Sequence, residues 1–358
     1  MCYEAVTFTD SKIIMATKKT ILFTSMRILA SVIIIGLFIL EGYSIIIQKE
    51  GENTLPPLFG NFPKNTSFLE SQLEKDGFIF AVVGDTHSSG TFEQIIKEWS
   101  YEKLDFAVML GDCVRHGTDE EHAYFRAECA NEFILPFPIF YIVGNHDISP
   151  KKFPVSRFEE VYGPTIFSFR YQQCLFIGLQ VLDDPATNEE SLAFLEKLDK
   201  TELQKYRYRF VFMHIPLSIY GDNRMRTFIG QEKFAKLFEE LGINYVFAGD
   251  YHGYMRVEKG NIKYLVTGGG GATLYQPIGK QFHHCIFIRV NREGVAETMI
   301  PVEYTVDLED MFERAAFIHI YPALKRNIAV SIAFNLIILV ILILLLKRLI
   351  LPHRKKPE

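Results

Sequence analysis

Short apolar runs recur along the middle of this 358-residue chain, and most of them end at a glycine. Continuous runs of four to seven apolar residues, rich in β-branched and aromatic side chains, are typical of strands buried on both faces of a sheet. Stretches with helical periodicity separate the runs. This alternation predicts an α/β fold with a largely parallel sheet. The predicted strands are FIFAVVG (78–84), DFAVMLG (105–111), PIFYIVG (138–144), RFVFM (209–213) and YVFAG (245–249), and the predicted helices are 91–103, 119–134, 190–206 and 231–241.

Further strands are predicted at 165–180 and by two shorter runs at 263–267 and 284–290. Because the last two runs follow one another near the end of the domain, we expect them to pair as a second sheet. Residues 49–67 contain three prolines and two glycines, which is the composition of a linker.

Two long apolar segments flank this region. Residues 28–47 are long enough to cross a bilayer, which takes about 20 apolar residues, and Glu41 is the one charge among them. A cleaved signal peptide with its apolar core at 28–40 is the alternative. An uncleaved anchor is favoured because no small-residue cleavage site follows that core. Residues 328–346 contain no charge and only Ser331 and Asn335 as polar interruptions. A buried core helix would rarely be so apolar all round, so a second membrane helix is predicted.

Basic residues set the expected topology. They precede the first apolar segment and follow the second, so both termini are expected in the cytoplasm and the domain outside it. Lys325 and Arg326, on the outer flank of the second segment, weaken this assignment. The expected organisation is a cytoplasmic N-terminus (1–27), a signal-anchor helix (28–47), a linker and domain entry (48–77), the main domain (78–305), a juxtamembrane segment (306–327), a membrane helix (328–346) and a basic cytoplasmic tail (347–358).

Composition narrows the function classes. The formal net charge is -5, so no basic footprint for nucleic acid is indicated. Cys113, Cys129, Cys174 and Cys285 fall in the main domain without zinc-knuckle spacing, and either disulfides or buried thiols are compatible with their even number. Asn65-Thr66-Ser67 has the form of a glycosylation acceptor.

Metal-binding residue types follow five of the predicted strands. In open α/β sheets the carboxyl ends of the strands line the ligand crevice, so these side chains are expected at one edge. Each short motif is common by itself, whereas five in series after five strands are not. The residues are Asp85 and His87, then Asp112, then Asn145, His146 and Asp147, then His214, and finally Asp250 and His252.

Carboxylate, imidazole and amide oxygen donors together suit divalent ions such as manganese, iron or zinc. Two such ions about 3.5–4 Å apart can clamp the attacking and leaving oxygens of an in-line displacement and activate a water. A phosphoester presents such oxygens. The pattern therefore predicts a centre with two divalent metal ions that acts on a phosphoester.

The series DTH, GD, GNHD, H and GDYH resembles the calcineurin-like metallophosphoesterase superfamily, in particular a membrane-anchored member of bacterial type. The resemblance implies a four-layer α-β-β-α sandwich over 78–305. It implies that Asp85, His87 and His252 bind one metal, that Asp112 bridges, and that Asn145, His214 and Asp250 bind the second. It also implies a catalytic role for His146, whose ring Asp147 is expected to orient.

Two departures from the family pattern change the expectations. The usual last motif is Gly-His-x-His, whereas Asp250 stands at the first histidine here, as it does in some phosphodiesterases resembling alkaline phosphatase D. The added charge leaves the second metal open. The Asp-Arg pair of the protein phosphatases is absent. Arg115 or His116 could contact phosphate, but a solvated role is equally compatible with the sequence.

Other features carry less weight. Gly268 to Gly271 fit a tight turn better than a phosphate loop. His283 and His284 open a strand and are expected to be structural, and Asn223 with Arg224 is a weak candidate for substrate contact.

The leading hypothesis is a membrane-anchored, extracytoplasmic hydrolase of a phosphomonoester or phosphodiester, with a lipid- or glycan-linked substrate open and the bilayer as its partner. One alternative is a non-catalytic metal-binding scaffold of the same fold. Another is an endoplasmic-reticulum or Golgi glycan-phosphate phosphodiesterase, since Lys355 and Lys356 have the form of a retrieval signal.

Overall fold

The computed structural model describes residues 4–50, 55–60, 62–87, 90–131, 135–219, 228–274, 280–305 and 308–350. The chain divides into two compact units. One comprises Glu50–Met311, and the other comprises Met1–Lys49 with Phe312–Glu358.

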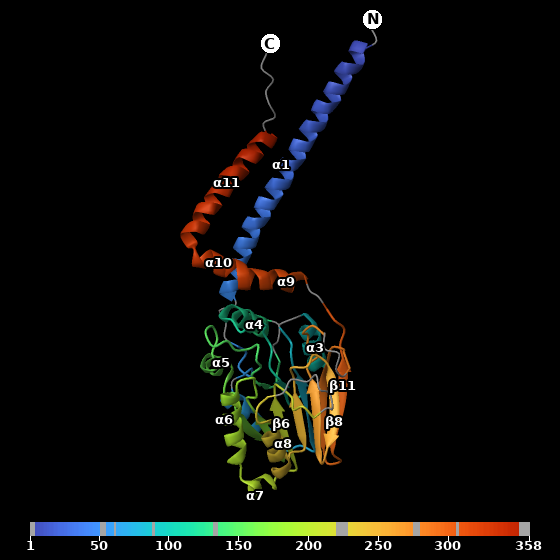
Figure 1. Ribbon diagram of the computed structural model, residues 1–358, viewed down its shortest axis with the longest axis vertical. Coiled ribbons are helices and arrows are strands. Elements are labelled where there is room, and N and C mark those ends of the chain that lie inside the picture. The colour runs from blue at the N-terminus through green and yellow to red at the C-terminus, as the bar shows by residue number, and fades with distance from the viewer. Residues whose placement is uncertain are drawn as a thin grey trace. The chain divides into compact units, whose positions relative to one another are not determined.

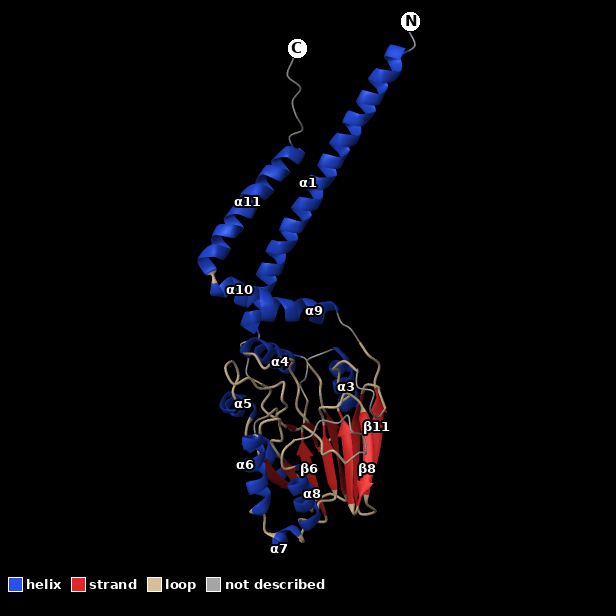
Figure 2. Ribbon diagram, viewed as in Figure 1, coloured by secondary structure: helices blue, strands red, loops and turns tan. Residues whose placement is uncertain are grey.

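The larger unit contains two sheets, whose strands are drawn in Figure 2. The five-stranded sheet has the order β11-β10-β1-β2-β3. Its strands β1, β2 and β3 run parallel, while β10 is antiparallel to β1 and β11 to β10. The bounds are β1 Gly77–Val83, β2 Phe106–Met109, β3 Ile139–Tyr141, β10 His284–Asn291 and β11 Val295–Pro301.

The six-stranded sheet has the order β4-β5-β6-β7-β9-β8. Strands β5, β6, β7 and β9 run parallel, and the edge strands β4 and β8 are antiparallel to their neighbours. The bounds are β4 Phe167–Tyr171, β5 Cys174–Gly178, β6 Tyr208–Met213, β7 Tyr245–Ala248, β8 Tyr254–Lys259 and β9 Ile262–Thr267.

The two sheets face each other across an aromatic core that includes Phe80, Phe106, Phe176 and Phe210. The outer face of the five-stranded sheet packs on α3 (Gly90–Tyr101) and α4 (Asp119–Asn131) through a second cluster. The outer face of the other sheet packs on α6 (Pro185–Glu196) and α8 (Gln231–Glu240), which lie side by side (Figure 1). Helices therefore cover both sheets, and the predicted four-layer α-β-β-α sandwich is confirmed. Because the inner strands are buried on both faces, their apolar runs are continuous.

Several elements differ from the expectation. The helix predicted at 190–206 is two helices, α6 and α7 (Lys200–Leu203), because the Asp199 side chain accepts from Thr201 N at 2.8 Å and starts a new one. The runs 263–267 and 284–290 do not share a sheet: β9 joins β7, whereas β10 joins β1. The predicted second sheet of that pair was wrong. Helices α2 (Phe62–Glu70) and α5 (Val155–Tyr162) were not predicted, nor were β8 and β11.

The smaller unit is helical. It contains α1 (Glu4–Glu50), the end of α9 (Leu308–Ala315), a π-helical turn (Ala316–Ile320), α10 (Tyr321–Arg326) and α11 (Ile328–Ile350). Residues Thr17–Ile46 and α11 are long and apolar enough to cross a membrane. Asn335 of α11 donates to the Glu41 carboxylate of α1 at 2.6 Å, so the polar interruptions of the two apolar segments meet.

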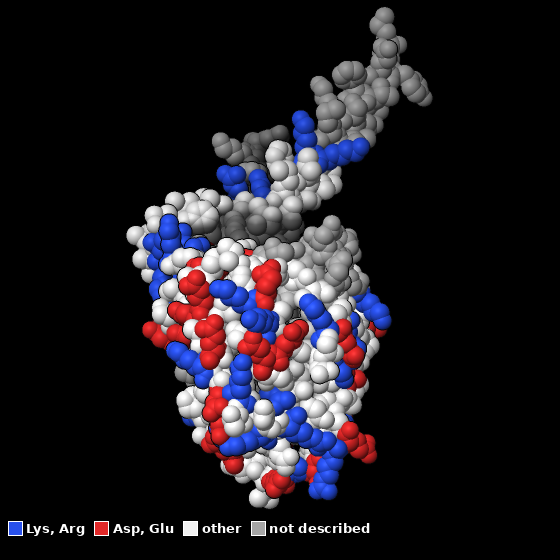
Figure 3. Space-filling view, turned by 60° about the horizontal axis from the view of Figure 1, so that its bottom comes forward, with Lys and Arg blue, Asp and Glu red and all other residues white. Residues whose placement is uncertain are grey.

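Three polar features of the sequence now have a location. Cys113, Cys129, Cys174 and Cys285 are buried free thiols. Asn65 is fully buried in α2 and donates to Ile139 O at 2.9 Å, so the folded domain does not offer it for glycosylation. Figure 3 shows Lys and Arg interspersed with Asp and Glu over the face that it displays, in keeping with the balanced net charge.

Candidate metal centre

The backbone turns sharply at the residues that follow the strands. Among the described non-glycine residues, positive φ occurs at Asp85 (59°), His87 (53°), Asp112 (55°), Asp250 (64°) and, away from this edge, at Gln172 (49°). This left-handed region is sparsely populated, although Asp, Asn and His enter it more readily than other residues do. A strained backbone conformation of this kind persists only where the surrounding structure holds it in place. Such conformations are concentrated at functional sites.

Glycines directly before the predicted ligands Asn145 and Asp250 allow the strand ends to approach each other. A Cβ at Gly144 would lie 2.2 Å from Asp112 Oδ1, and one at Gly249 would lie 2.8 Å from Asp85 Oδ2. The Gly-Asp and Gly-Asn pairs of the sequence are therefore a packing requirement of the site.

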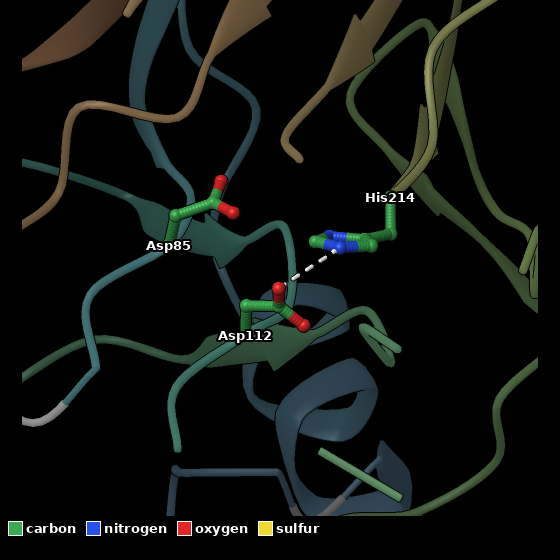
Figure 4. A group of neighbouring side chains, drawn as sticks. All are labelled: Asp85, Asp112 and His214. Atoms are coloured by element: carbon green, nitrogen blue, oxygen red, sulfur yellow. Dashed lines mark ion pairs between the residues drawn. The ribbon is translucent and has the colours of Figure 1, made fainter. Parts of the chain in front are cut away.

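Three buried side chains from separate strand ends form the centre of this edge. Asp85, Asp112 and His214 point toward one another (Figure 4), and each offers one ligand atom within 4.8 Å of the others. His214 Nε2 lies 3.3 Å from Asp112 Oδ2. Burial opposes the charged forms, but their mutual attraction prevails: the pKa of Asp112 falls to about 2 and that of His214 rises to about 10.

Further predicted ligands surround His214. Its Nε2 lies 2.9 Å from Asn145 Oδ1 and 3.9 Å from Asp250 Oδ1, while its Nδ1 contacts Leu110 O at 2.7 Å. A ring N–H directed at a backbone carbonyl fixes the tautomer that leaves Nε2 for a metal. Three oxygens converge on one ring nitrogen, which is the arrangement expected around a cation.

His87 and His252 lie beside Asp85. His252 Nε2 is 3.5 Å from Asp85 Oδ1, and its Nδ1 contacts Thr273 O at 2.7 Å. The His87 ring centroid is 5.6 Å from that of His252. Burial lowers the pKa of His87 to about 3, so the ring is neutral, as a ligand must be. The structure thus brings all seven predicted ligands together in two overlapping groups.

The residues fit divalent cations. Asp85 Oδ1 is buried and makes no hydrogen bond to any described residue. Burial raises the pKa of Asp85 well above its usual value, and the charges of Asp112 and Asp250 add to this. A buried carboxylate in this condition needs a cation to remain ionised.

The contact predicted between Asp147 and the His146 ring was wrong. His146 Nδ1 lies 2.6 Å from Arg115 O, so the backbone carbonyl of a neighbouring loop holds the ring. The backbone N–H of His146 donates to Asp112 Oδ1 at 2.8 Å. His146 is exposed, and its ring centroid is 5.8 Å from that of His87.

Asp147 instead holds two loops together. Its fully buried carboxylate accepts five hydrogen bonds, from the backbone N–H of Asp112 (2.8 Å), Cys113 (2.8 Å), Val114 (3.3 Å) and Gly144 (2.8 Å) and from Tyr141 OH (2.8 Å). Burial and the nearby Asp112 charge raise the pKa of Asp147 to about 6. Sequence spacing gave no signal for this role, because four of the five donors are backbone groups.

The weaker candidates also have definite places. His116 is paired with Glu121, with Nδ1 3.0 Å from Oε1, and its side chain is largely exposed. A Cβ at Gly268 would lie 2.6 Å from Asp85 Oδ2, so the glycine run borders the site. His284 is buried against Thr267 Oγ1 at 3.1 Å, a structural role as expected. Asn223 and Arg224 lie outside the described residues.

Comparison with known proteins agrees with this geometry. The family model described as calcineurin-like phosphoesterase matches residues 78–254. Residues 78–254 therefore form a calcineurin-like phosphoesterase domain. A bovine (Bos taurus) relative, serine/threonine-protein phosphatase CPPED1, is 30% identical over 129 residues, which is 32% of this chain and 41% of that protein. The 3',5'-cyclic adenosine monophosphate phosphodiesterase CpdA of Haemophilus influenzae is 38% identical over 69 residues, or 18% of this chain and 23% of that protein.

Among solved structures, the purple acid phosphatase PPD1 from yellow lupin (Lupinus luteus) superposes with a TM-score of 0.49 at 15% identity, covering 67% of this chain and 55% of that chain. A dimetal phosphatase from Danio rerio superposes with a TM-score of 0.44 at 13% identity, covering 63% and 99%. The chain spans less than half of either curated relative, so the named activities belong to those proteins.

Proposed function

We propose that this protein hydrolyses a phosphomonoester or phosphodiester with two divalent metal ions. The observation that carries the proposal is the convergence of three acidic side chains that are almost fully buried, Asp85, Asp112 and Asp250, on one edge with His214. Such an excess of buried negative charge is tolerated where cations bind. The ligand set would be Asp85, His87, Asp112, Asn145, His214, Asp250 and His252, with manganese, iron or zinc as candidate metals.

When bound, the two ions would polarise the phosphoryl oxygens and lower the pKa of an attacking water. The chain's own residues then hold and move protons. Because Arg115 O accepts from Nδ1 of His146, Nε2 is the nitrogen available to the substrate. Protonated at that atom, His146 would donate to the leaving oxygen. Asp147 acts at a distance by fixing the backbone of Asp112.

We also propose that the domain is anchored by α1 and α11, with both termini cytoplasmic and the domain on the other side. The helices' length and hydropathy and the placement of flanking basic residues support this topology. Protease added to intact cells should digest the domain. Digestion confined to the cytoplasmic side would contradict the topology.

The activity is tested on the full chain in detergent, after loading with Mn²⁺, with aryl phosphodiester and monoester substrates. Asp112→Asn should lose metal and lower turnover by at least about a hundredfold. His146→Ala should keep the metal but lower turnover about 10²–10⁴-fold, because it removes a proton donor. Asp76→Asn, in an exposed pair with Arg292, is the matched control and should behave as wild type.

Wild-type protein that binds metal but turns over neither substrate would identify the non-catalytic scaffold. Unchanged turnover in both Asp112→Asn and His146→Ala would refute the assigned centre.

A further inference from the structure

Helix α9 exposes a set of large apolar side chains. Leu308, Met311 and Phe312 are 67%, 58% and 61% exposed. Their spacing of three and four residues places them on one helical face. A soluble domain rarely leaves such a face in water, and a short amphipathic helix of this kind is typical of the boundary between lipid headgroups and acyl chains.

Within the helical unit, the second half of α9 is tied to the end of the apolar part of α1. Tyr43 OH donates to Glu313 Oε1 at 2.6 Å, and Tyr43 stands four residues before Ile47, the end of the apolar segment. Tyrosines at this depth are typical of the membrane–water interface. Basic residues suited to lipid phosphates follow in α10, where Lys325 lies over the Tyr321 ring at 5.9 Å.

Within the phosphoesterase unit, the chain reaches α9 from the edge that carries the metal-ligand candidates. After β11, Val302 N donates to His283 O at 2.9 Å, and the Tyr304 ring stacks on that of His283 at 5.3 Å. Thr305 N donates to Thr91 Oγ1 at 3.1 Å. Thr91 is in the first turn of α3, four residues after His87.

The short stretch of chain between Thr305 and Leu308 connects these observations. Leu308 follows Thr305 by three residues, which span at most about 10 Å. If the exposed face of α9 lies in lipid, Thr305 lies within that distance of the lipid surface, and its partner Thr91 is one hydrogen bond farther away. Chain length and this hydrogen bond therefore limit how far the metal-ligand candidates can lie from the surface that α9 contacts. Phosphoesters of membrane lipids are concentrated at such a surface.

We propose that α9 seats its Leu308–Met311–Phe312 face in the bilayer that α11 spans, and that the substrate is a phosphoester borne by a membrane lipid. The occupant of this face is lipid because α9 leads through the π-helical turn and α10 directly into α11, which is long and apolar enough to cross a membrane. This substrate class rests on the hydrolase function proposed above, whereas the lipid contact does not.

Lipid contact is measured by tryptophan quenching in the full chain. The chain has one tryptophan, Trp99, which is fully buried and serves as an internal reference. Phe312→Trp in phosphatidylcholine nanodiscs should be quenched strongly by brominated acyl chains. Leu73→Trp, at a position 85% exposed, is the control and should show only the Trp99 background. Equal quenching in both variants would overturn the lipid contact, as would shielding that depends on self-association of the protein.

Substrate class is measured with Mn²⁺-loaded protein in nanodiscs that contain phosphatidic acid or phosphatidylglycerol, beside soluble bis(4-nitrophenyl) phosphate. Leu308→Ser with Met311→Ser should lower turnover of the lipid on the order of tenfold, because two apolar side chains leave the bilayer, and should spare the soluble diester. Leu73→Ser with Tyr101→Ser, both also exposed, should spare both substrates.

The outcomes separate the two proposals. Turnover of the soluble diester with neither lipid hydrolysed would overturn the lipid substrate and leave the hydrolase intact. Failure to hydrolyse any of the probes would overturn the hydrolase, while the quenching result would still decide whether α9 contacts lipid.

Discussion

The two ends of the β-sandwich differ in the groups that surround their buried carboxylates. At the carboxyl ends of the strands, Asp85, Asp112 and Asp250 lie around His214. At the amino ends, the buried carboxylate of Asp105 accepts from Lys75, from Tyr171 OH at 2.5 Å and from Ile79 N at 3.0 Å. Asp105 is therefore neutralised by groups of the chain itself.

A cleft of about 480 Å³ also lies at the amino ends, lined among others by Lys75, Asp76, Arg207 and Arg292. Its charges have both signs, and Asp76 pairs with Arg292 in the open. The presence of a cleft is therefore not by itself evidence of a catalytic site. What distinguishes the other end is that three acidic side chains, almost fully buried, lie close to one another and to His214.

The sharpest test of this contrast compares the two buried carboxylates that organise the two ends. Asp147→Asn replaces an acceptor of five hydrogen bonds by a group with one oxygen, so the variant should lose about 3 kcal/mol of stability. It should also lower metal affinity about 10–100-fold, because Asp112 loses its backbone support. Thermal unfolding and metal titration of the full chain in detergent measure the two effects.

Asp105→Asn is the matched control for that variant. It should destabilise the domain by about 2 kcal/mol without any change in metal affinity, since its donors lie at the far ends of the strands. Equal metal affinity in Asp147→Asn and wild type would show that Asp147 does not position Asp112.

A smaller effect is expected from pH. Burial lowers the pKa of His122 to about 4; the ring stacks on Phe153 and bridges Tyr162 OH and Asp147 O. The unfolded chain binds this proton below about pH 6.5, but the folded chain binds it only below about 4. The contribution of the neutral His122 ring to the free energy of unfolding is therefore fully present above pH 6.5. As the pH falls from 6.5 to 4, on the order of 3 kcal/mol of stability is lost.

His122→Gln should flatten the fall in unfolding temperature between pH 7 and pH 4.5. His116→Gln removes a largely exposed histidine and should leave that slope unchanged. A slope in His122→Gln identical to that of wild type would assign the acid sensitivity to other groups.

The smallest effect is expected at the open pair of the amino-end cleft. Both side chains of Asp76 and Arg292 are 82% exposed, so Arg292→Ala should change stability by less than about 0.5 kcal/mol. Metal content and turnover should not change. A loss of turnover would mean that the cleft takes part in function. It would contradict the conclusion that the two ends of the sandwich differ in function.

The sequence predicted the sandwich and the convergence of the site residues because the first depends on the pattern of apolar residues and the second on which residues follow each strand. Continuous apolar runs marked the buried strands, and the residue after each run marked the shared edge. Sheet membership could not be predicted for β10, since its apolar run is equally compatible with either sheet. Asn65 shows the same limit, because a glycosylation motif does not reveal that its side chain donates to Ile139.

The His146 and Asp147 pair shows why contacts are harder to predict than location. The two residues are adjacent in sequence, which suggested a direct interaction, but each is satisfied by backbone groups of another loop. Backbone carbonyls and N–H groups belong to every residue and therefore leave no mark in a sequence motif.

The left-handed backbone at Asp85, His87, Asp112 and Asp250 restricts how this site can evolve. A metal would accept glutamate or cysteine at such positions, but the backbone favours only Asp, Asn, His and Gly there. Substitutions at these positions are thus confined to the few residue types that can both bind a metal and adopt a positive φ. Asp250, at the position where the family resemblance implies a histidine, belongs to the same small set of residue types.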